Sequence, residues 1–120
     1  MKLFGKELIL DLGKCSHRIS DRVFLVEFAA ELCSKIDMKA YGECQTPYFG
    51  TNSDLTKGYS LLQFIETSSI TGHFSDTFRT AHLNIFSCKD FDADVAAEFC
   101  AKFFGAIIVN KTVLDRYMEK

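Results

Sequence analysis

The chain has no tryptophan, a single proline and no apolar run of the length that crosses a membrane. The near lack of proline, together with 48% hydrophobic residues and twelve phenylalanines, excludes the composition of a disordered chain. The segment after Met1 also has too short an apolar stretch to act as a secretion signal. We therefore expect residues 1–120 to form one compact domain that is neither exported nor inserted into a membrane.

An excess of positive charge and paired cysteine motifs are lacking as well. The net charge is -2 and the fourteen lysines and arginines are scattered, so nucleic acid is not an expected partner. The five cysteines are odd in number and widely spaced, with no C-x-x-C pair: Cys15, Cys33, Cys44, Cys88 and Cys100. This spacing predicts free thiols in a reducing cytoplasm and gives no zinc signature, so no metal is expected.

What the chain does contain is a regular succession of apolar patterns. Helical periodicity predicts a helix over residues 21–36, with Ser20 as its N-cap, and a second helix from the N-cap Asp92 to Gly105. Alternating or continuous apolar segments predict strands over residues 4–12, 39–49, 58–66, 69–73, 78–87 and, as one closing strand, 106–109 and 112–114.

The predicted order is strand, helix, strand, strand, followed by strand, strand, helix, strand. Each helix is apolar on one face only, and the strands follow one another as hairpins. We therefore expect an α+β fold: a two-layer sandwich with a mainly antiparallel sheet, both helices on one face, and two similar βαβ-type halves. The other face of the sheet is free to carry a site or a partner subunit.

Residues 66–88 hold the residue types of a chemical site. Ser68 is a latent nucleophile, His73 follows it by five residues as a base, and Cys88 follows it by twenty residues as a thiol acid. The same residue types also fit a serine-rich turn, a surface histidine and a buried cysteine at a strand end. A metal site formed by His73, His82 and Cys88 is a third interpretation.

Four segments carry a resemblance to a known family. Residues 4–15 hold a glycine, an apolar run, an acidic residue and a cysteine, and residues 58–60 read Gly-Tyr-Ser. Residues 68–73 read Ser-Ser-Ile-Thr-Gly-His, and residues 84–88 read Asn-Ile-Phe-Ser-Cys. Over nearly the whole chain they resemble the small prokaryotic S-adenosylmethionine decarboxylase proenzymes, which are pyruvoyl enzymes with the motifs Gly-x-Ser, Ser-His-Ile-Ser-Ile-His and Asp-Ile-Phe-Thr-Cys.

The resemblance implies a chain that cuts itself before Ser68 and converts that serine into an N-terminal pyruvoyl group. His73 is then expected to be the processing base, and Ser60 a second hydroxyl near the oxyanion. In decarboxylation the ketone accepts the electrons that the departing carboxylate leaves, and Cys88 returns a proton to the α-carbon. No metal is needed for this chemistry.

The resemblance also implies S-adenosylmethionine, or a related α-amino acid, as the substrate, a role in polyamine and spermidine synthesis, and a homodimer. The expected substrate-binding residues are Asp11, Glu66 and Asp76. Asp11 lies at the end of an apolar strand, where an acidic side chain is either an ordinary solvated charge or a carboxylate directed into a cleft.

Two departures from the family leave alternatives open. The family has glutamate before the cleaved serine, whereas here Thr67 precedes Ser68 and Glu66 comes one residue earlier. Cleavage before Thr67 would leave a ketobutyryl group but loses both the histidine and the cysteine spacings, so Ser68 is the preferred residue. The family's Trp-Pro-Glu is replaced by residues 75–77, Ser-Asp-Thr. The alternative function is an unprocessed, non-catalytic homologue that binds a nucleoside or a partner subunit.

Overall fold

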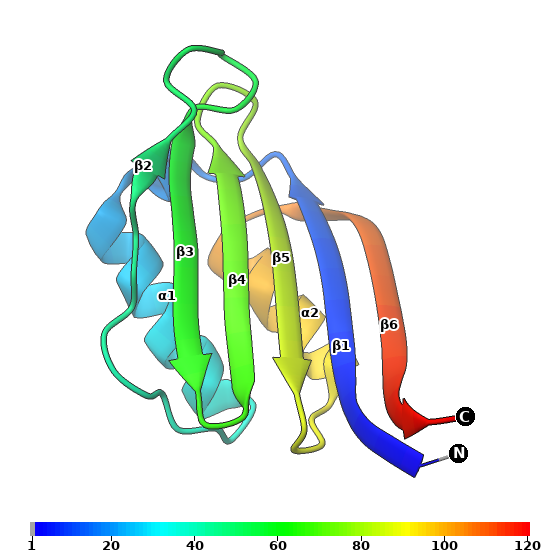
Figure 1. Ribbon diagram of the computed structural model, residues 1–120. Helices are drawn as coiled ribbons and strands as arrows, with labels where there is room; N and C mark the ends of the chain where they lie inside the picture. The colour runs from blue at the N-terminus through cyan, green and yellow to red at the C-terminus, as the bar shows by residue number, and fades with distance from the viewer. Residues whose placement is uncertain (1) are drawn as a thin grey trace.

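A computed structural model describes residues 2–120 as one antiparallel sheet with two helices packed on one of its faces (Figure 1). The six strands lie in the order β2-β3-β4-β5-β1-β6. Their bounds are β1 Lys2–Gly13, β2 Tyr48–Phe49, β3 Gly58–Ile65, β4 Ser68–Ser75, β5 Thr80–Ser87 and β6 Ile107–Glu119. The helices are the 3-10 helix η1 (His17–Ser20), α1 (Arg22–Lys35) and α2 (Ala93–Phe103). The predicted α+β two-layer sandwich and the order of its elements are confirmed.

The core lies between the sheet and the two helices. Alternate residues of the central strands face the helices and are buried, among them Leu8 and Leu10 on β1 and Leu83 on β5. Phe28 on α1 and Phe104 after α2 are also fully buried, with ring centroids 4.6 Å apart. Their contact fixes the two helices to each other above the sheet.

The helix ends differ in detail from the prediction. The N-cap of α1 is Asp21, whose side chain accepts a hydrogen bond from the backbone N–H of Val23, and not the predicted Ser20. Ser20 belongs to η1 and donates its hydroxyl hydrogen to Asp76. Asp92 caps α2 as predicted, by accepting from two backbone N–H groups of the first turn.

Two strands have other bounds than predicted. The expected strand over 39–49 is wrong for most of its length, because only Tyr48–Phe49 forms a strand and the rest touches β3 through two isolated bridges. Pro47 donates no backbone hydrogen bond, and Gly42 turns the chain with φ +71°, so a continuous ladder does not form. The closing strand is longer than predicted, since Ile107–Glu119 follows β1 along almost its whole length.

The second face of the sheet carries no helix (Figure 1). We call it the open face. Its side chains from β3, β4, β5 and β1 are partly or fully exposed and alternate with the buried ones. They are Ser60, Leu62, Phe64, Ser69, Thr71, His73, His82, Asn84, Phe86, Glu7, Ile9 and Asp11. Among residues 2–120, no helix has the length and apolar character needed to cross a membrane.

Replacing Phe104 by alanine tests the aromatic core. Phe104 is fully buried and its ring contacts Phe24, Phe28, Phe74 and Phe103, so we expect a loss of about 3–5 kcal/mol in the free energy of unfolding. Urea unfolding measures this loss. The matched control is Phe78→Ala, which removes an exposed ring and should change stability by less than about 0.5 kcal/mol. Equal losses in the two variants would contradict the described core.

Candidate active site

The predicted site residues fall into two groups at opposite ends of the sheet. β4 begins at Ser68, directly after the turn that joins it to β3, and this residue pairs with Ile65. Near the other end of the same strand, His73 pairs with Ser60. We call the first region, which consists of residues 66–68 with residues 87 and 88, the hairpin end.

Thr67 and Cys88 are in contact at the hairpin end. The hydroxyl oxygen of Thr67 lies 2.7 Å from the sulfur of Cys88, and Thr67 also donates to the carbonyl oxygen of Glu66 at 2.6 Å. All three residues are exposed. The interpretation of Cys88 as a buried strand-end thiol is therefore wrong, and this thiol is accessible at a turn.

The other four cysteines are buried. Burial raises the pKa of the Cys15 thiol to about 11 and that of the Cys100 thiol to about 12. These thiols stay protonated and pack as small apolar side chains. Cys88 is thus the exposed thiol of the part of the chain that the structure describes.

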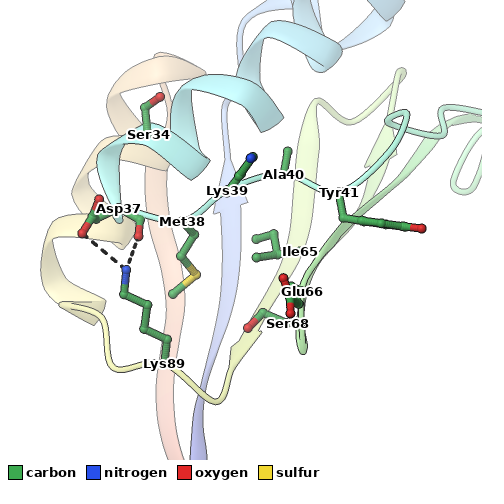
Figure 2. A pocket seen from close by; sticks show the side chains of 10 residues that line it. All are labelled: Ser34, Asp37, Met38, Lys39, Ala40, Tyr41, Ile65, Glu66, Ser68 and Lys89. Carbon is green, nitrogen blue, oxygen red and sulfur yellow. Dashed lines mark hydrogen bonds and ion pairs between the residues drawn. The ribbon is translucent and has the colours of Figure 1, made fainter.

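Ser68 faces the helix layer, unlike its neighbour Thr67. Its side chain is buried and its hydroxyl donates to the hydroxyl oxygen of Ser87 at 2.9 Å. Ser87 also accepts from the backbone N–H of Lys89. Glu66 and Ser68 help to line a cavity of about 640 Å³ between the hairpin end and the C-terminal part of α1 (Figure 2). Lys89 borders the same cavity and contacts Asp37.

A row of polar side chains crosses the open face at the other end of the sheet. The Ser60 hydroxyl oxygen lies 2.8 Å from Nδ1 of His73, which pairs across the strands with His82. Nδ1 of His82 lies 2.8 Å from a carboxylate oxygen of Asp11. The other oxygen of Asp11 accepts from the side-chain amide of Asn110 at 3.3 Å. We call these five residues the histidine row.

The histidine row borders a cavity of its own, of about 470 Å³, which Ser60, His73 and His82 line together with the loop after β2. Asp76 lies at this end of β4 too, just after the strand. It accepts hydrogen bonds from the hydroxyls of Tyr48, at 2.5 Å, and Ser20, at 2.8 Å. The carboxylate of Asp76 therefore ties three distant segments of the chain together.

The nucleophile and the base predicted from the sequence do not meet within one chain. Ser68 lies on the buried face of β4 and His73 on the open face. Five residues of a strand span about 16 Å, so the two side chains are far apart as well as on opposite faces. The structure brings Ser60 together with His73, and Glu66 together with Ser68. The two pairs lie at opposite ends of the sheet. Residues 2–120 hold no group of three or more side chains placed to bind a metal, the trio of His73, His82 and Cys88 included.

Comparison with known proteins identifies the family of the chain. The sequence profile of the family described as S-adenosylmethionine decarboxylase matches residues 6–117. The chain belongs to the S-adenosylmethionine decarboxylase family. A crystal structure of the adenosylmethionine decarboxylase from Aquifex aeolicus VF5 has the same fold, with a TM-score of 0.80 over 100% of this chain and 96% of that one, at 17% sequence identity. A search of curated protein sequences found no match.

Within the S-adenosylmethionine decarboxylase fold, sequence spacing missed two features. One is the contact of Thr67 with Cys88, and the other is the link from His82 to Asp11. A strand places residues an odd number apart on opposite faces, so the interval of five between Ser68 and His73 already indicated their separation. The partners of Thr67 and Asp11 depend on strand pairing, which no local pattern specifies.

The histidine row predicts a measurable pH effect. The hydrogen bond from His82 lowers the pKa of Asp11 from its ordinary value of 3.8, against a smaller opposing effect of burial. A lowered pKa means that Asp11 stabilises the fold above its ordinary pKa, and that this stability is lost as the pH falls through the lowered value. We expect His82→Ala to move the Asp11 carboxyl titration, followed by NMR, to higher pH. The control His73→Ala should leave it in place, and an unmoved titration in His82→Ala would contradict the link.

Proposed function

We propose that the chain is a self-processing decarboxylase whose reactive carbonyl group forms from a hydroxyl residue of the turn between β3 and β4. The proposed substrate is S-adenosylmethionine or a related α-amino acid, and the product would feed polyamine and spermidine synthesis. The observation that carries this proposal is the contact, at the exposed turn of the hairpin end, between the hydroxyl of Thr67 and the thiol of Cys88 in a chain of this family. Because its five thiols are free, we place its action in the cytoplasm.

The residues of the hairpin end fit a carbonyl group derived from the chain. Thr67 and Ser68 each supply a hydroxyl on Cβ next to a peptide bond of an exposed turn. A ketone-bearing group supplies an electron sink for the decarboxylation of an amino acid. Cys88 is positioned to hold a proton on its sulfur 2.7 Å from the Thr67 hydroxyl, and to deliver it to a substrate carbon bound at this turn.

Of the three carboxylates predicted to bind substrate, Glu66 is the best placed at the hairpin end. Its side chain is exposed and forms no ion pair within residues 2–120, so it is available to a cationic group such as a sulfonium or an amine. Asp76 and Asp11 already accept two hydrogen bonds each at the other end of the sheet. In our proposal they reach a substrate only if a second chain supplies the hairpin end.

A homodimer joined through the open face provides that arrangement. His73 on β4 and its cross-strand partner Ser60 on β3 lie on this face, about 16 Å along the strands from the hairpin end. A two-fold axis perpendicular to the strands and parallel to the sheet reverses the strand direction, so that the hairpin end of one chain comes opposite the histidine row of the other. The face offers apolar area for the contact: Phe64 is 50% exposed, and Leu114, which pairs with the open-face residue Glu7 in the ladder of β1 and β6, is 41% exposed.

The proposed activity is tested by following carboxyl-labelled S-adenosylmethionine, with methionine and ornithine in parallel, and measuring released carbon dioxide. We expect release from one substrate after incubation, together with two chain fragments. Hydroxylamine, which captures ketones, should abolish the release of carbon dioxide but leave the two fragments in place. The control is the double variant Thr67→Ala, Ser68→Ala, which removes both hydroxyls and should give neither fragments nor carbon dioxide. Release by this variant, or an intact and inactive wild type, would refute the proposal.

The shared site is tested by co-expressing His73→Ala with Cys88→Ala. Each variant alone is expected to be inactive, while a mixed dimer regains one intact site of two, or about a quarter of wild-type activity after random pairing. Sedimentation of the wild type should give the mass of a dimer. A monomer, or mixed dimers without activity, would exclude a site shared between chains.

A further inference from the structure

We propose that Thr67, and not Ser68, is the residue that cleaves the chain and becomes the carbonyl group. Cleavage before Thr67 gives a 2-oxobutanoyl group, which has one carbon more than pyruvoyl. This inference rests on the proposed self-processing and identifies the residue that carries it. Three observations support it: the position of the Thr67 hydroxyl, the backbone conformation of Thr67 and the burial of Ser68.

The Thr67 hydroxyl lies against the peptide bond that it has to attack. Its oxygen is 2.6 Å from the carbonyl oxygen of Glu66. Because a C=O bond is about 1.23 Å long, the carbonyl carbon is no more than about 3.8 Å from the hydroxyl oxygen. Attack on this carbon closes a five-membered ring, and the reacting atoms are already close to the separation of a near-attack arrangement.

The backbone at Thr67 is strained. Its φ is +59°, a left-handed conformation that is unfavourable for a β-branched residue. A strained residue held at an exposed turn, with β3 and β4 paired on both sides, is typical of a site where strain serves a reaction. Breaking the bond between Glu66 and Thr67 releases this strain, whereas breaking the next bond leaves Glu66 and Thr67 joined.

The side chain of Ser68 points away from the exposed turn, into the helix layer. It is 8% exposed, it pairs with Ile65 and with Ser87 in the ladders on either side, and its hydroxyl donates to Ser87. Its oxygen therefore points into the helix layer and is occupied by a buried hydrogen bond. For Ser68 to attack the carbonyl of Thr67, this bond has to break and the side chain has to rotate within a packed strand.

Cys88 acts on Thr67 as a positioning residue. The contact of 2.7 Å between its sulfur and the Thr67 hydroxyl holds that side chain over the turn. The same contact leaves the thiol beside the carbon that becomes the ketone. One thiol thereby serves both the cleavage and, in the proposed decarboxylation, the return of a proton.

The chemistry balances with water as the single co-reactant. The Thr67 oxygen bonds to the Glu66 carbonyl carbon, the carbon–nitrogen bond breaks, and the hydroxyl proton moves to the freed nitrogen. The resulting ester then loses the α-proton of Thr67 to a base, and the bond between Cβ and oxygen breaks to release Glu66 as a carboxylate. The enamine left at position 67 shifts to an imine, and water replaces its nitrogen, which leaves as ammonia.

Intact mass spectrometry of wild type and three single variants tests the assignment, with borohydride reduction to mark any ketone. We expect wild type and Ser68→Ala to give fragments 1–66 and 67–120, the second beginning with a 2-oxobutanoyl group. Thr67→Ser should cut at the same bond and leave pyruvoyl at position 67, and Thr67→Ala should not cut there. Circular dichroism confirms that each variant folds.

The other possible results separate the role of Thr67 from the proposed self-processing. Fragments 1–67 and 68–120, with pyruvoyl at position 68, would overturn the role of Thr67 while leaving the proposed function intact. No cleavage in wild type, Thr67→Ser or Ser68→Ala would overturn both. For the positioning role, we expect Cys88→Ala to slow cleavage about tenfold and Cys88→Ser, which keeps a hydrogen-bonding atom, to recover most of the rate. Equal rates in these two variants would remove Cys88 from the cleavage step.

Discussion

The two-residue period of β4 is the constraint on which the site depends. Because side chains alternate across a strand, Ile70 and Phe74 enter the core, and Ser68 enters it with them. His73 is then committed to the open face. Shifting the register by one residue would exchange the two groups but would also expose the core residues of the strand. The burial of apolar side chains, more than any polar contact, therefore decides which functional groups share a face.

Much of the fold follows from local sequence pattern, because each helix has one apolar stripe and the strands alternate. The predicted positions of α1, α2, β3 and β5 are within about three residues of the observed ones. The strand predicted for the segment before β2 does not form in spite of its apolar residues, because Pro47 and the turn at Gly42 prevent a ladder there. Local pattern also could not supply the partners of the site residues, because these come from strand pairing between segments far apart in the chain.

Family membership and site geometry answer different questions. The similarity to the Aquifex aeolicus enzyme at 17% identity establishes a shared fold, which many sequences with the same alternation can adopt. Reactivity depends instead on a few atoms at one turn. There the chain has Glu66-Thr67-Ser68, and it is the conformation of the turn, rather than the sequence spacing, that distinguishes the two hydroxyls.

The order of the strands has a consequence for a chain that is cut at the turn between β3 and β4. The N-terminal piece contributes β1, β2 and β3, and the C-terminal piece contributes β4, β5 and β6, yet β1 lies between β5 and β6 (Figure 1). The two pieces are interleaved, so neither can complete the sheet alone, and neither can leave without breaking three ladders: β3 with β4, β5 with β1, and β1 with β6. A cut chain is in effect an obligate heterodimer. Unfolding of a single cut subunit is therefore itself a dissociation, and its refolding depends on the concentration of both pieces.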